Sequence, residues 1–202
     1  MQHRIFDNIG KQDVEHTITG QTIMVRKILH LSLILLPLVF CVVIFLIMSS
    51  LSVQAQTTEA NQSQPQIEML LLALLVVGFA VMAGGPKLKT MLLKPSLLLN
   101  KVKPYLESGE EGAEKKIVSI LLAHQLITSV ILLALSETLA LFGLALIFYA
   151  STQGIDQHPI VWLALIPTLL HIMSAILTFP SRKSVVDTVY EQMIRPIARY
   201  QG

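Results

Sequence analysis

Apolar residues gather into four long runs along the chain, and each run ends on polar or charged residues. The runs cover residues 28–50, 67–84, 117–150 and 160–179. A bilayer core about 30 Å thick needs roughly 20 apolar residues in a helix. None of the runs shows the two-residue alternation that a barrel strand requires. The pattern therefore predicts four membrane-spanning α-helices.

Basic residues occur only at every second connection between these runs. The chain has 15 Lys and Arg. They lie before the first run, between the second and third, and after the fourth, whereas residues 51–66 and 151–159 contain none. Because cytoplasmic loops carry the basic excess, we expect both termini and residues 85–116 to face the cytoplasm. The expected fold is an all-α integral membrane four-helix bundle, N-in and C-in, over residues 28–180.

The cytoplasmic parts have three distinct patterns. Residues 1–27 are polar and predict a short arm. We expect Gly84-Gly85-Pro86 to end the second span, and the alternating leucines and lysines of 85–116 to form interfacial helices with leucines in the acyl boundary. Residues 181–202 predict an amphipathic helix capped by Ser181, packed on the membrane face or on residues 85–116.

Residues 24–55 have a second interpretation. A basic start at Met24-Val-Arg-Lys, an apolar run and Val53-Gln-Ala55 imitate a cleaved signal peptide. Cleavage there would leave a three-span protein that begins at Gln56. We expect the segment to be retained as a span, because its apolar run exceeds a signal-peptide core and 23 residues precede Met24.

Composition narrows the class of protein. Hydrophobic residues make up 53% and charged residues 14%, against about 25% charge in soluble domains. One cysteine excludes a disulfide framework, and a net charge of +2 with dispersed basic residues argues against nucleic acid as a partner. The expected partners are the lipid bilayer and another membrane protein or a second copy of this chain. Short loops and a compact helical design favour a bacterial cytoplasmic (inner) membrane.

Glu137 and His171 are the ionisable residues deepest in the predicted spans. Buried carboxyl groups usually face the bundle interior, and a rise of about 1.5 Å per residue puts the two at similar depth. We expect them to pair, either as a clasp that fixes helix register or as a proton-carrying pair. A ligand contact, or no contact at all, is the remaining alternative. The polar residues Gln125, Ser129 and Ser136 share one stripe of the third span, which suits helix contacts.

Two further histidines lie near the cytoplasmic ends of the first and third spans. His30 and His124 could ligate haem b axially, or each could be an amphipathic residue at the interface. We predict no other cofactor. We also predict no metal site, because the sequence has no Cys pair and no His/Glu metal signature.

The stretch Leu133-Ala-Leu-Ser-Glu137-Thr-Leu-Ala-Leu-Phe-Gly143-Leu-Ala-Leu-Ile-Phe148 resembles the carboxylate-bearing helix of the rotary ATPase proteolipid, subunit c. The resemblance implies that Glu137 carries a proton or sodium ion. It covers sixteen residues. The glycine repeat of the family's partner helix has no counterpart in residues 67–85, so we do not expect ring assembly.

Three function classes follow. We expect a small accessory, assembly or structural component that contacts other membrane proteins, because the polar stripes suit helix contacts and no enzyme motif is visible. A proton- or ion-handling protein built on Glu137 is the alternative. A membrane enzyme with an unrecognised site is the third, and we predict no catalytic residues.

Overall fold

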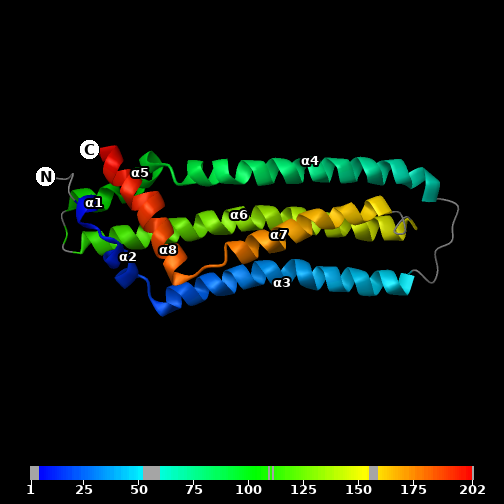
Figure 1. Cartoon of the computed structure of the whole chain (residues 1–202), viewed down its shortest axis with the longest axis horizontal. Coiled ribbons are helices and arrows are strands. Elements are labelled where there is room, and N and C mark those ends of the chain that lie inside the picture. The colour runs from blue at the N-terminus through cyan, green and yellow to red at the C-terminus, as the bar shows by residue number, and fades with distance from the viewer. Residues whose placement is uncertain (1–4, 52–59, 109, 111, 155–158, 202) are drawn as a thin grey trace. The chain divides into compact units, whose positions relative to one another are not determined.

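The computed structural model describes residues 5–51, 60–108, 110, 112–154 and 159–201. Within these residues every regular element is a helix, and four helical segments are long and apolar enough to cross a membrane. Figure 1 shows the order of the elements along the chain. The four predicted spans are thereby confirmed as helices, namely α3 (Gly20–Leu51), α4 (Ala60–Leu92), α6 (Ala113–Thr152) and the 3₁₀ helix η2 (Pro159–Leu165) followed by α7 (Ile166–Leu177).

The expected end of the second span at Gly84-Gly85-Pro86 is wrong. Helix α4 continues through these residues to Leu92. A glycine ends a helix by taking a positive φ, and among the described residues only Gly112 and Gly154 do so. Pro86 removes one backbone donor, which a membrane span can tolerate. The break falls instead before Pro95, which begins α5 (Pro95–Ser108) at the first helical position, where proline is favoured.

The chain forms two compact units. Unit 1 comprises Met1–Leu29, Pro86–Ile131 and Phe179–Gly202, and unit 2 comprises His30–Gly85 and Leu132–Thr178. Helices α3, α4 and α6 contribute residues to both units. Unit 1 also contains α1 (Ile5–Asn8), α2 (Lys11–Thr17), α5, α8 (Arg182–Val189), the π-helical turn η3 (Tyr190–Ile194) and α9 (Arg195–Gln201).

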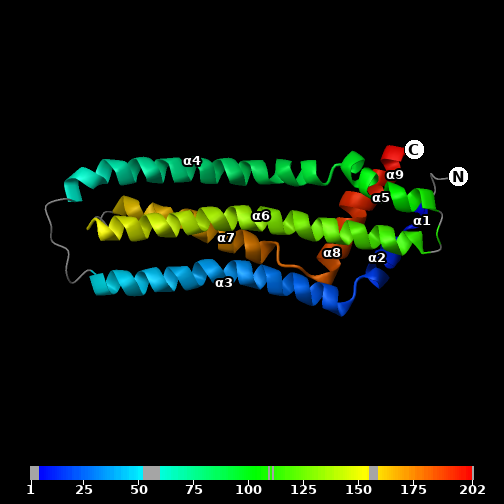
Figure 2. The same ribbon diagram turned by 180° about the vertical axis from the view of Figure 1, so that it is seen from behind.

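Unit 1 has a hydrophobic core to which all three of its chain segments contribute. Figure 2 shows α1, α2, α5, α8 and α9 gathered around the first part of α6. Apolar side chains from these elements are almost fully enclosed. The core includes Phe6, Ile9, Val14, Leu98, Val102, Leu106, Ile117, Leu121, Val185, Val189, Met193 and Ile197.

The leucine-rich face of α5 is part of this core, which corrects the expectation that it lies in the acyl boundary. Leu98, Val102 and Leu106 recur every four residues and are 0%, 0% and 7% exposed. Helix α9 packs against α5. Protein thus covers the face that the sequence pattern assigned to lipid, because an amphipathic pattern does not distinguish the two kinds of apolar cover.

The C-terminal helices agree with the predicted pattern. Ser181 caps α8, and its hydroxyl accepts a hydrogen bond from the Ser184 amide at 3.1 Å. Val185, Val189 and Met193 lie on the buried face. Because they share a core with α5, the helix packs on residues 85–116, one of the two expected supports.

Unit 2 has a second core, made where its four helical segments meet. Side chains of α3, α4, α6 and η2 enclose one another, while large apolar side chains such as Phe45, Phe79 and Phe142 are more than half exposed. An apolar exterior of this kind suits a hydrocarbon environment. The core residues are Ile44, Met48, Ile67, Leu71, Leu144, Leu146, Ile147, Ala150, Val161 and Ala164.

Candidate functional site

A buried polar seam lies between α6 and α7 in unit 2. His171, Thr168 and Glu137 are 1%, 3% and 8% exposed, although they are polar residues in apolar helices. Buried polar groups are costly in hydrocarbon unless they have partners. The seam is therefore the first place to look for chemistry in this unit.

Small residues bring the two sides of the seam into backbone contact. A side-chain carbon at Gly143 would fall 2.2 Å from the carbonyl oxygen of Ala164, so only glycine fits there. One turn further along α7, the Thr168 hydroxyl donates to the carbonyl oxygen of Ala140 at 3.2 Å. Small and hydroxyl residues of the third and fourth spans thus face each other, which allows the two helices to approach closely.

Both ring nitrogens of His171 are engaged. Nε2 lies 2.9 Å from the carbonyl oxygen of Leu33 in α3, and Nδ1 lies 2.8 Å from the Ser136 hydroxyl in α6. A carbonyl oxygen can only accept, so Nε2 carries the hydrogen. His171 consequently links α7 to two other helices of the unit.

The hydroxyl of Ser136 has one hydrogen and two acceptors within reach. Its oxygen is 2.8 Å from His171 Nδ1 and also 2.8 Å from the carbonyl oxygen of Leu133. With a neutral imidazole, the hydroxyl donates to Nδ1. With a protonated ring, Nδ1 donates to Ser136, whose hydrogen turns to Leu133. The direction of the hydrogen bond between His171 and Ser136 therefore depends on which ring nitrogens carry hydrogen.

Glu137 does not form the hydrogen bond with His171 that the sequence predicted, because His171 bonds to Ser136 and Leu33 instead. Its Oε1 is buried and has no hydrogen-bond partner among the described residues. Ser136 and Glu137 differ by about 100° around the helix, and that rotation places the serine against the ring.

The other two polar candidates of the third span belong to unit 1. The Gln125 side-chain amide donates to the Ser129 hydroxyl at 3.2 Å. Its Oε1 accepts a hydrogen bond from Arg26 Nη1, and Arg26 Nη2 donates to the Leu122 carbonyl oxygen at 2.5 Å. Gln125 and Ser129 are thus grouped with an arginine of α3.

Sequence reasoning missed Arg26 as a buried residue. It was counted among the basic residues that flank the first span, yet its side chain is only 2% exposed. Its spacing from His30, which is 3% exposed, was an available signal, because residues four apart share a helix face. Two polar residues on one face at the start of an apolar run indicate a contact with another helix.

His30 and His124 lie in different units, His30 on α3 and His124 on α6. The Lys101 ammonium donates to Nδ1 of His124 at 2.8 Å, and Nε2 donates to the Leu92 carbonyl oxygen at 2.9 Å. Axial ligation of haem iron would have to displace one of these bonds. Among the described residues no three His, Cys, Asp or Glu side chains gather closely enough to hold a metal ion.

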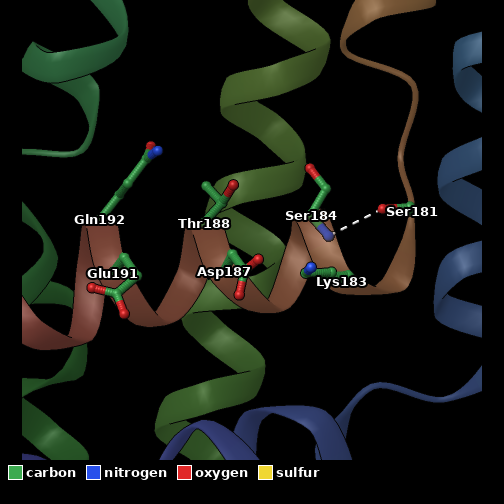
Figure 3. A pocket seen from close by; sticks show the side chains of 7 residues that line it. All are labelled: Ser181, Lys183, Ser184, Asp187, Thr188, Glu191 and Gln192. Atoms are coloured by element: carbon green, nitrogen blue, oxygen red, sulfur yellow. Dashed lines mark hydrogen bonds between the residues drawn. The ribbon is translucent and has the colours of Figure 1, made fainter.

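An open polar hollow of about 430 Å³ lies along α8 and η3, and Figure 3 shows the side chains that line it. Ser184, Thr188 and Gln192 form one row along the helix, and Lys183, Asp187 and Glu191 form the neighbouring row. Both acids have cationic partners: Asp187 pairs with Lys11, and Glu191 with Arg195 at 2.6 Å. The hollow is lined by hydroxyl and amide groups and by charged side chains of both signs. The lining residues are Ser181, Lys183, Ser184, Asp187, Thr188, Glu191 and Gln192.

Comparisons with known proteins add no assignment: no family model, curated protein or solved structure matches this chain. The likeness of residues 133–148 to the proteolipid helix therefore stays local to the part of α6 that carries Glu137.

Proposed function

We propose that this is a bacterial inner-membrane protein, a four-helix bundle with both termini in the cytoplasm, that works by contacting other membrane proteins or a second copy of itself. In this arrangement the helices of unit 1 that lie outside the spans form the cytoplasmic part, and the four spans are the anchor. The three chain segments of unit 1 are the same three that carry every Lys and Arg of the sequence. Their common core supports placing them on one side of the membrane.

The core of unit 1 is the observation that carries this proposal. A membrane anchor needs no folded part outside the bilayer, yet α1, α2, α5, α8 and α9 assemble around α6 and leave a polar face along α8. Most of the apolar residues of the spans are not covered by protein. In the most apolar stretch of the first span 17% is buried, and in that of the second span 11% is buried. Lipid and partner helices can both cover such surfaces.

The proposed membrane topology is tested by thiol labelling in intact cells. Cysteine replaces Ser108 at the exposed end of α5, in a Cys41→Ser background, and a second variant carries cysteine at Ser63. A membrane-impermeant reagent should label the Ser63 variant in intact cells and the Ser108 variant only after lysis. Labelling of the Ser108 variant in intact cells would overturn the topology.

The contact function is tested by photo-crosslinking in cells. A photoreactive residue replaces Thr188 on the polar face of α8, and Lys103 on the exposed side of α5 provides a matched control. We expect one adduct of defined mass from Thr188, and co-purification of the same partner after mild detergent extraction. A chain that stays monomeric, with no adduct at either position, would contradict the proposal.

A second function, proton handling at the seam, is favoured by the buried Oε1 of Glu137 beside the Ser136–His171 hydrogen bond. The purified protein is placed in liposomes that hold a pH gradient. Wild type and Glu68→Gln, a glutamate variant elsewhere in unit 2, should dissipate the gradient, whereas Glu137→Gln should not. Equal leak from all three proteins, or none from wild type, would rule this function out.

A further inference from the structure

Charges in unit 1 are segregated. Ion pairs in and just after α5 join Lys103 to Glu107 at 3.6 Å and Lys116 to Glu110. Between Glu68 and Glu107, by contrast, the sequence has no acidic residue at all. Four lysines of this stretch precede Lys103, which pairs with Glu107 in α5. They are Lys87, Lys89, Lys94 and Lys101.

Lys101 is held in place by a neutral group. Its ammonium donates to His124 Nδ1 at 2.8 Å, and His124 Nε2 donates to the carbonyl oxygen of Leu92, the last residue of α4. An ammonium can only donate and a carbonyl oxygen can only accept. His124 is therefore neutral in this arrangement, and it orients the lysine without compensating its charge.

The remaining donors of Lys101 are available at an exposed position. An ammonium has three hydrogens, and His124 accepts one of them. Glu107, the acidic residue nearest in sequence, pairs with Lys103 instead. No ion pair of Lys101 is found among the described residues, so its full positive charge faces outward.

Two exposed apolar side chains belong to the same stretch of chain as Lys94 and Lys101. Met91 is 66% exposed at the end of α4, and Leu97 is 45% exposed in the first turn of α5. Lys94 lies between them in sequence, two residues after the Leu92 carbonyl that His124 binds. A ligand that satisfies this surface must be anionic at one end and apolar at the other.

We propose that Lys101 and Lys94 bind the phosphate of an acidic phospholipid whose acyl chains cover Met91 and Leu97. His124 acts as the positioning residue that presents Lys101. Basic groups at the cytoplasmic end of membrane helices are suited to anionic headgroups. This site lies outside the seam and outside the polar hollow. The inference rests on the proposed topology, which puts residues 85–116 on the cytoplasmic side, and on neither the contact function nor proton handling.

Native mass spectrometry of the full-length protein in detergent tests the site. Phosphatidylglycerol and phosphatidylcholine are titrated separately, and inorganic phosphate is added as a competitor. We expect wild type to retain phosphatidylglycerol in preference to phosphatidylcholine. Lys101→Gln should bind phosphatidylglycerol about fivefold more weakly, the effect of one surface cation. Lys103→Gln, which removes a lysine already paired with Glu107, should leave binding unchanged.

Three outcomes would overturn the proposal. Equal retention of the two lipids would mean that no acidic headgroup is recognised. Unchanged binding by Lys101→Gln would move the site elsewhere, provided circular dichroism shows the helix content of wild type. Displacement of the lipid by inorganic phosphate at equal concentration would show a site for free anions rather than for a phospholipid.

Discussion

Gly143 of α6 and Ala164 of η2 approach so closely that a side-chain carbon on the glycine would lie 2.2 Å from the alanine carbonyl oxygen. The obstructing atom belongs to the backbone and cannot rotate away. The contact sets how near the third and fourth spans can come, and with it the distance across which Thr168 and His171 reach α6.

The first prediction concerns this contact. Gly143→Ala should lower the free energy of unfolding by about 1–3 kcal/mol, because the helices must separate to admit the methyl group. Gly78→Ala is the matched control, since no atom lies within 4 Å of the added carbon, and it should be neutral or slightly stabilising. Reversible unfolding in detergent measures both. Equal effects would show that Gly143 is not at a close contact.

The second prediction concerns the partner of His171. A double-mutant cycle with Ser136→Ala and His171→Leu should give a coupling energy of about 0.5–2 kcal/mol, the range of interhelical hydrogen bonds in membranes. The cycle that pairs Glu137→Leu with His171→Leu should give a smaller value, because these side chains share no hydrogen bond. A larger coupling in the second cycle would restore Glu137 as the partner.

The third prediction concerns the buried guanidinium of unit 1. Arg26→Met should cost about 1–3 kcal/mol, because the Leu122 carbonyl and the Gln125 side chain lose a charged donor. Lys27→Met alters the next residue, whose side chain is exposed, and should change stability by less than about 0.5 kcal/mol. Equal losses from the two variants would place Arg26 at the surface.

The fourth prediction concerns pH. The ion pair with Asp187 raises the pKa of Lys11 above its ordinary value of 10.5, with Glu191 and Glu15 adding to the effect. A raised pKa stabilises the fold below pH 10.5 and ceases to do so as the pH rises through the folded-state value. Asp187→Asn should therefore lower the melting temperature at pH 8. The difference in melting temperature between this variant and wild type should become smaller in strongly alkaline solution.

Controls for the pH prediction follow from the same pair. Lys11→Gln should reproduce the loss seen with Asp187→Asn at pH 8, and the double variant should lose no more than either single change. If the difference in melting temperature between Asp187→Asn and wild type stays constant between pH 8 and pH 12, Lys11 does not bond to Asp187 in solution.

The sequence predicted the four apolar helices well because each run is long enough for a membrane helix and lacks the two-residue alternation of a strand. It placed the end of the second span wrongly, since the rule that Gly84, Gly85 and Pro86 end helices is drawn from chains in water. In α4 these residues keep helical backbone angles and the helix runs on to Leu92. The sequence also assigned the apolar face of α5 to lipid. The periodicity of apolar residues shows that one face of the helix is shielded from water, but it does not show whether lipid or protein shields it.

The seam was predicted in part. Depth along the membrane placed His171 within reach of the turn that holds Ser136 and Glu137, because rise per residue is nearly constant. Which of the two it bonds depends on the rotation of α6, and the sequence carries no direct record of that angle. Arg26 was missed for a related reason. A count of basic residues predicts on which side of the membrane a segment lies, but it does not predict which groups an individual arginine binds.

The charge layout has an electrical consequence. Unit 2 contains no Lys or Arg, and its acidic residues are Glu59, Glu68, Glu137 and Asp156. Moving one elementary charge across 100 mV changes the energy by about 2.3 kcal/mol. To turn over, the molecule would have to carry the basic residues of three segments outward against an inside-negative potential. In the proposed topology, the orientation would therefore be settled once, during insertion, and an energised membrane would hold it there afterwards.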